Sequence, residues 1–308
     1  MVKERALSFS DDSANVALPS TPATSISSTS SGRDQLFLQP LEPAVCLFRM
    51  RRLQSTWYHE LFLSGRTVWP DPESYLWNAC QEMRRWFENL PDSITQPVRT
   101  KFDLEVLYSY IYVLSPSPKI PNIPSLGQSL VFEYCIEYTA RMLDVLQDMD
   151  KSAIYTCHDI LRVDYVGRRF RVVLWNHLEQ LLNGVLYETS RAPQALLTPL
   201  IVSNPNPQNN TARAIKCING VFEILDIFGR KSGYMALRDK FGADTQPLLD
   251  ELYARQHGFH HPSNSGSIGY RRRTAAGPEL DLVSHVGENR GTRQFQPPGP
   301  RSRSYQGT

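Results

Sequence analysis

Residues 101–118 read KFDLEVLYSYIYVLSPSP, and this stretch decides the fold class. From Lys101 to Leu114, apolar residues occur on nearly every side of a helical projection, which is typical of a helix buried among other helices. Ser115–Pro116–Ser117–Pro118 ends this helix, because each proline disfavours helical backbone at the residue before it. The sequence therefore predicts a central helix over residues 101–114.

Two further helices are predicted before this central helix. The first has apolar residues every three or four positions, on a face made by Leu47, Met50, Leu53, Trp57 and Leu61. Gly65 is its expected stop. The second begins at Asp71–Pro72–Glu73, with a capping residue, a proline in the first turn and an acid beside it. Its apolar positions continue to Leu90–Pro91.

Helical periodicity also predominates after the prolines. It predicts helices over residues 126–149, 152–161, 163–185, 212–229, 234–241 and 248–253, with a loop rich in proline and asparagine over residues 190–211. No Asn-Gly or Asp-Gly hairpin signal occurs, and no segment shows sustained alternation. We therefore expect an all-α protein with an irregular multi-helix domain.

Composition divides the 308 residues into three zones. Residues 1–35 are rich in Ser and Thr and have few large apolar residues, so we expect disorder there. Residues 36–254 carry nearly all of the Trp, Leu, Ile and Val and form the expected helical domain. Residues 255–308 turn to Arg, Gly and Pro and are expected to be a second disordered segment, with a net charge of +5.

Net charge, cysteine spacing and the length of apolar stretches exclude several classes of protein. The net charge of the whole chain is only +2, too small for nucleic-acid binding by bulk charge. The five cysteines lie at least 22 residues apart, so neither a disulfide framework nor a cysteine zinc site is indicated. The longest strongly apolar charge-free stretch is too short to span a bilayer, and we expect no membrane association.

The search for catalytic motifs is negative. Phosphate-binding, dinucleotide-binding, nucleophile-elbow and H-E-x-x-H patterns are all missing from the sequence. His158 and His177 lie on expected helices, where a packed or surface role is commoner than catalysis, and His260–His261 lies in the C-terminal zone. We therefore expect no enzyme activity, no catalytic, cofactor-binding or metal-binding residues, and no cofactor.

Aromatic and basic residues have two interpretations each. The five tryptophans either line a ligand pocket or form the core, and helical spacing favours the core: Trp57, Trp69, Trp77, Trp86 and Trp175. Arg51–Arg52 and the group Arg168–Arg169 with Arg171 are interpreted as solvated helix faces rather than phosphate contacts. Arg271–Arg272–Arg273 is a candidate nuclear-import patch.

The order of several segments resembles the C-terminal part of the regulatory (middle homology) domain of fungal zinc-cluster transcription factors. The segments are Met50-Arg51-Arg52-Leu53-Gln54-Ser55, Arg85–Pro91 (RWFENLP), Leu104–Leu114 followed by SPSP, and Ala214–Phe228 followed by Ala236–Phe241 (ALRDKF). The resemblance covers residues 43–254. The family's six-cysteine DNA-binding cluster is not visible, since zinc requires closely spaced ligands.

This resemblance implies a nuclear transcriptional regulator, expected to control a biosynthetic (secondary-metabolite) gene cluster. Its expected partners are other transcription regulators or a full-length zinc-cluster factor, with DNA contacted weakly or indirectly and a small-molecule effector as a further candidate ligand. The alternative is a helical ligand-binding or protein-interaction module without direct DNA contact.

Overall fold

A computed structural model describes residues 41–65, 67–147, 155, 157–182 and 209–257 of the chain, and these residues are mostly helical and contain no strand. The expected all-α class is confirmed. The predicted disorder of residues 1–35 and of the zone from residue 258 lies outside the described residues. Arg255 and Gln256, which composition places with the C-terminal zone, belong to the last helix.

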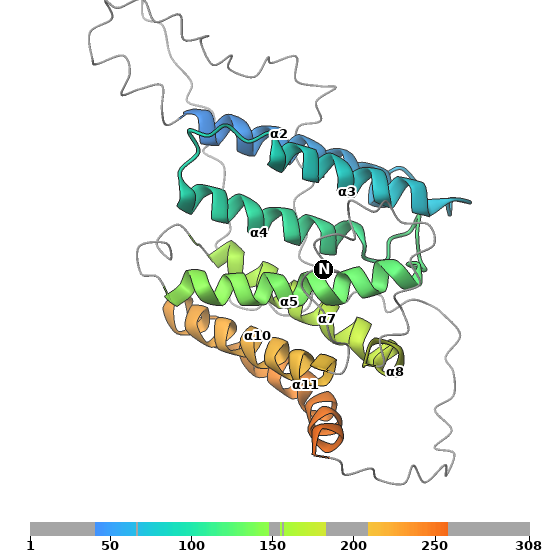
Figure 1. Cartoon of the computed structure of the whole chain (residues 1–308), viewed down its shortest axis with the longest axis vertical. Helices are drawn as coiled ribbons and strands as arrows, with labels where there is room; N and C mark the ends of the chain where they lie inside the picture. Colours follow the sequence, from blue (N-terminus) through green and yellow to red (C-terminus); the bar gives the residue numbers. More distant parts are fainter. Residues whose placement is uncertain (1–40, 66, 148–154, 156, 183–208, 258–308) are drawn as a thin grey trace, which may run out of the picture. The chain divides into compact units, whose positions relative to one another are not determined.

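Within the described residues, eight α-helices and one π-helical turn occur in the following order. They are α2 (Leu41–Tyr58), η1 (His59–Leu63), α3 (Pro72–Glu88), α4 (Gln96–Val113), α5 (Ser125–Gln147), α7 (Cys157–Asn176), α8 (Leu178–Leu182), α10 (Asn210–Ser232) and α11 (Met235–Gln256). Figure 1 shows α2 and α3 on one side of α4, then α5 and α7, then α10 and α11. Each of these groups of helices packs against the next one in this order.

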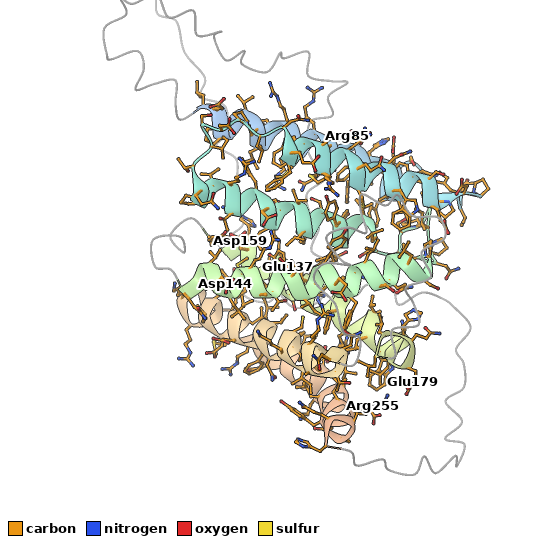
Figure 2. All side chains as sticks on the ribbon, in the orientation of Figure 1. Arg85, Glu137, Asp144, Asp159, Glu179 and Arg255 are labelled. Carbon is orange, nitrogen blue, oxygen red and sulfur yellow. The ribbon has the colours of Figure 1, made fainter. Side chains whose placement is uncertain are left out.

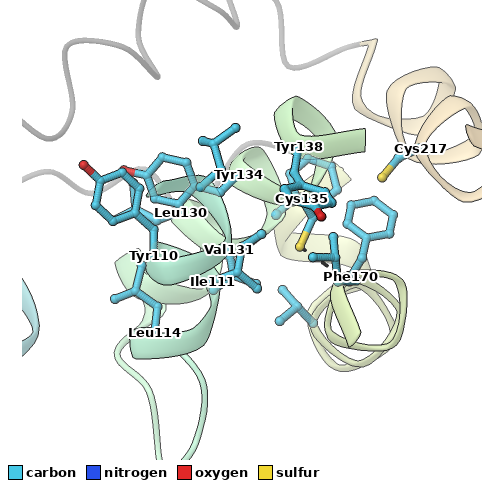
Figure 3. Close-up of a cluster of buried hydrophobic side chains, with 14 of the residues drawn as sticks. Tyr110, Ile111, Leu114, Leu130, Val131, Tyr134, Cys135, Tyr138, Phe170 and Cys217 are labelled. Atoms are coloured by element: carbon cyan, nitrogen blue, oxygen red, sulfur yellow. Dashed lines mark hydrogen bonds between the residues drawn. The ribbon is translucent and has the colours of Figure 1, made fainter. Parts of the chain in front are cut away.

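Helix α4 is the central helix predicted from the sequence. Nine of its residues are buried, and no residue from 98 to 115 is fully exposed. Figure 3 shows Ile111 and Leu114 facing Val131 of α5, with Phe170 of α7 beyond them. Phe132 and Phe170 stack with ring centroids 5.3 Å apart. Burial on all sides explains why the helix has no polar stripe.

In the loop after α4, the serines and the prolines differ in their burial. Ser115 and Ser117 are buried, whereas Pro116 and Pro118 are exposed. The Ser115 hydroxyl donates to the Ile111 carbonyl over 2.6 Å and accepts from the Tyr165 hydroxyl over 3.0 Å. The loop thus ends α4 and also fixes it to α7.

Several predicted boundaries shift. The helices predicted over residues 152–161 and from 163 onward are one helix in the described range, α7, because no breaker separates their periodicities. That second prediction ran to residue 185, but α7 ends at Asn176, and a turn at His177 leads into α8. The helices predicted over 234–241 and 248–253 are also continuous, as α11, with Pro247 inside it.

Two further boundaries depend on backbone geometry. Helix α10 passes Gly229 and ends before Gly233, whose φ of +77° is favourable only for glycine. Gly65, the predicted stop of the first helix, has φ of +102° and follows the π-helical turn. A positive φ, rather than a glycine as such, is what ends each segment.

Candidate functional site

An open pocket with a volume of about 370 Å³ lies on the outer face of α10. Four exposed residues of α10 recur at helical spacing along it, and α5 and α11 contribute its sides. The lining residues are Leu143, Ala212, Ile215, Lys216, Asn219, Gly220, Glu223 and Gln256. A single lysine and a single glutamate are its only charged members.

Close packing holds the helices around this pocket in place. A Cβ on Gly220 would lie 2.7 Å from Thr139 Cγ2 and 3.0 Å from Leu143 Cδ1, so α5 approaches α10 where α10 has no side chain. On the other side, Asn219 Nδ2 donates to the Tyr253 hydroxyl of α11 over 3.3 Å. The pocket is therefore a fixed depression between α5 and the end of α11.

A buried ionic cluster lies at the junction of α2, α4 and α7. Glu105 of α4 is only 3 % exposed, and both of its carboxylate oxygens accept from Arg51 of α2 over 3.1 Å. Arg162 of α7 donates to the same carboxylate and, over 3.2 Å, to the buried Asp159. Two guanidinium groups thus balance two carboxylates, which is the usual condition for burying charge.

The second cavity lies against this cluster and has a volume of only about 10 Å³. The Tyr155 hydroxyl and the cluster's Glu105, Asp159 and Arg162 line it, and this hydroxyl is buried with no hydrogen-bond partner among the described residues. Such a space holds about one water molecule. The contacts of the cluster itself join α2, α4 and α7. Figure 2 marks Asp159 at its position in the fold.

A second buried ion pair joins α5 to α10. Glu133 is 3 % exposed and accepts from both terminal nitrogens of Arg213, which also donates to Asn210 Oδ1 over 2.9 Å. Asn210 in turn donates to the Leu181 carbonyl of α8 over 2.8 Å. This chain of contacts fixes the start of α10 against α8.

Two arginines of α7, Arg168 and Arg171, are paired rather than freely solvated. Arg168 contacts Asp164 over 2.6 Å, and Arg171 donates to the Asp244 carbonyl of α11 over 3.3 Å. Burial raises the pKa of the Asp164 carboxyl, while the positive charges of Arg168 and Lys240 oppose that rise. These arginines therefore tie α7 to itself and to α11.

The tryptophans do not line either cavity. Trp57 and Trp77 are buried in the main core, and Trp69 and Trp86 pack against buried clusters, as helical spacing predicted. Trp175 differs, because 61 % of it is exposed on α7. Four of the five tryptophans therefore lie in or against the buried core, which supports the core interpretation.

The candidate histidines and cysteines lie apart. His158 is exposed, and His177 Nδ1 lies 2.9 Å from Gln180 Oε1, whereas His260–His261 lies outside the described residues. Burial raises the pKa of Cys80 and of Cys217 to about 12, which keeps both thiols protonated. No group of three or more metal-ligating side chains occurs within the part of the chain that the structure describes.

Comparisons with known proteins add no relative. No family model matches the chain, and no curated protein or solved structure matches it either. Of the helices described, none is both long and apolar enough to cross a membrane.

The α10 pocket was not predicted from the sequence. The available signal was the recurrence of Ala212, Lys216, Asn219 and Glu223 every three or four residues, opposite the apolar face of the same helix. That pattern predicts an outward face. It does not show that α5 and α11 rise on either side of it, which is what turns the face into a pocket.

Proposed function

We propose that this chain is a transcriptional regulator acting in the nucleus on a biosynthetic (secondary-metabolite) gene cluster. Its helical domain resembles the regulatory domain of fungal zinc-cluster factors. It contacts DNA weakly or indirectly and acts through other regulators or a full-length zinc-cluster partner. A small molecule that alters these contacts is a further candidate ligand.

The observation that carries this proposal is that two segments of the quoted resemblance, Met50–Ser55 and Leu104–Leu114, contact each other. Arg51 of the R-R-L-Q-S segment pairs with Glu105 on α4, and Gln54 Nε2 donates to the Ser109 hydroxyl over 2.8 Å. These partners are 54 and 55 residues apart in the chain. Residues that recur together in a family pattern are expected to share such contacts.

The other motif segments are joined in the same manner. Trp86 of RWFENLP packs edge-on against Phe102 of α4, with ring centroids 5.3 Å apart. Arg238 of ALRDKF contacts Asp226 of α10 over 2.7 Å and lies over the Phe222 ring. The pattern thus follows the contacts between helices, which supports a shared architecture with that family.

A tethering experiment tests the proposed function. The full chain is fused to the DNA-binding module of an unrelated regulator, and expression of a reporter bearing the matching site is measured. We expect reporter expression to change relative to the module alone, because a regulatory domain acts wherever it is brought to a promoter. Glu105→Gln should abolish the change, whereas Glu88→Gln at an exposed helix pair should leave it intact.

Two results contradict this proposal. One is an unchanged reporter when the fusion is present in the nucleus at the level of the module alone. The other is exclusion of a fluorescent full-chain fusion from the nucleus. Specific, salt-resistant gel shifts by the chain alone would contradict indirect DNA contact, since phosphate contacts weaken by about 0.9 log units per log unit of salt for each phosphate neutralised.

The alternative function is a helical ligand-binding or interaction module without a role at DNA. The observation that favours it is the α10 pocket, whose volume lies within the range of about 300–1,000 Å³ usual for small-molecule sites. Thermal shifts of the full chain across a panel of small amphipathic compounds test it. A shift that Asn219→Trp removes, together with an unchanged reporter, would favour this alternative.

A further inference from the structure

The α10 pocket begins where the chain re-enters the described structure. Ala212 is the first lining residue and lies three positions after Asn209, the start of the described C-terminal part. The hydrogen bond from Asn210 to the Leu181 carbonyl holds this point beside the end of α8. Residues 183–208 therefore leave and return at nearly the same place, next to one end of the pocket.

The composition of this intervening segment suits an apolar, nearly neutral pocket. No charged residue occurs from Ala192 to Ala212, between Arg191 and Arg213. Five aliphatic residues fall within seven positions of it: Leu196, Leu197, Leu200, Ile201 and Val202. So many aliphatic side chains favour burial over contact with water.

The length of the segment allows it to reach the whole pocket. From Ala212 to Glu223 the pocket extends along α10 for about 16 Å at 1.5 Å per helical residue. From Asn209 back to Val202, an extended chain spans about 23 Å. The aliphatic run can therefore lie along α10 without any change in the described helices.

The C-terminal segment is a poorer occupant, although Gln256 also lines the pocket and residue 258 follows closely. That segment carries seven arginines from residue 258 onward, and its apolar residues are scattered. Lys216 and Glu223 cancel each other's charge, so the pocket has no net negative charge to attract arginines. Charge and composition both favour the uncharged segment.

We propose that residues 194–202 dock in the α10 pocket of their own chain, with the aliphatic run covering Ile215, Gly220 and Leu143. This inference is independent of the proposed role in transcription. It assigns the pocket an intramolecular occupant, so any other ligand of the pocket has to displace that segment.

Paired cysteines test the docking in the full chain. One variant combines Leu200→Cys with Asn219→Cys, which is exposed in the pocket; the matched control combines Ser265→Cys with Asn219→Cys. The thiol at residue 200 lies nine residues before Asn209, and the thiol at residue 265 lies eight residues after His257. The two thiols are therefore tethered by segments of similar length. We expect the Leu200 pair to form an intrachain disulfide about tenfold faster than the control, because docking raises the effective concentration of the two thiols.

Every other outcome overturns the proposal. Equal or faster reaction of the Ser265 pair assigns the pocket to the C-terminal segment. Disulfides that join two chains on a non-reducing gel assign it to a second copy. Slow reaction of both pairs shows that neither segment docks there.

A second variant provides a test that does not depend on disulfide formation. Replacing the five aliphatic residues of the run by serine removes the apolar occupant and leaves the described helices untouched. We expect far-UV circular dichroism to stay as in the wild type, while binding of a hydrophobic fluorescent dye increases and the Asn219→Cys thiol becomes more reactive. Unchanged dye binding and thiol reactivity would also overturn the proposal.

Discussion

Replacing Glu105 by glutamine tests whether the buried ionic cluster holds α2, α4 and α7 together. The substitution keeps the size of the side chain and removes its charge. Glu105 is 3 % exposed and contacts both Arg51 and Arg162, so both guanidinium groups lose their shared carboxylate. Leaving a buried charge without its partner costs about 3–5 kcal/mol.

The exposure of the partners sets the expected value within that range. Arg162 keeps Asp159 over 3.2 Å, and the Arg51 side chain is 36 % exposed, so water compensates part of the loss. We therefore expect Glu105→Gln to lower the free energy of unfolding by about 3 kcal/mol. Arg51→Met should cost less, because Glu105 then keeps Arg162.

Urea unfolding followed by circular dichroism measures both changes. The matched control is Glu88→Gln, which removes the charge from an exposed pair with Arg84 on α3, where the Glu88 side chain is 54 % exposed. That control should cost no more than about 0.5 kcal/mol. If Glu105→Gln lowers the free energy of unfolding by no more than the control does, the cluster does not stabilise the fold.

Three further predictions concern packing and titration. Ile111→Ala on α4 should lower the free energy of unfolding by about 2–5 kcal/mol, because its side chain is fully buried; a wild-type urea midpoint would contradict the central placement of α4. Gly167→Ala should lower the melting temperature, since its Cβ would lie 2.6 Å from Val221 Cγ1 and 2.7 Å from the Phe241 ring; an unchanged melting temperature would show that α7 and α10 are less closely packed than described. Burial raises the pKa of Cys217 from 9.0 to about 12, so the unfolded chain loses this proton first and the free energy of unfolding should fall as pH rises from about 9 to 12. Urea titrations at several pH values measure this change, and Cys217→Ala should make the free energy of unfolding depend less steeply on pH. An equal dependence in both proteins would show that Cys217 is not its source.

Local patterns in the sequence are enough to predict where most helices form. Periodicity predicted α4 as an apolar helix, and the Asp71–Pro72 start matches the beginning of α3. These signals are local, because residues three and four apart share a helix face whatever the rest of the chain does. The predicted side-chain cap is not formed, however, because the Asp71 carboxylate accepts from the Ser74 hydroxyl rather than from a backbone N–H.

In contrast, the contacts between helices and the partners of their polar residues depend on tertiary packing. Arg51 resembled a solvated arginine in sequence, yet it pairs with a carboxylate 54 residues away. The outward face of α10 becomes a pocket only because α5 and α11 pack beside it. Contacts of this kind depend on the packing of whole helix faces, which no local period encodes. The ion pairs and the pocket could not be predicted from the sequence for this reason, because their residues meet only when the helices pack together.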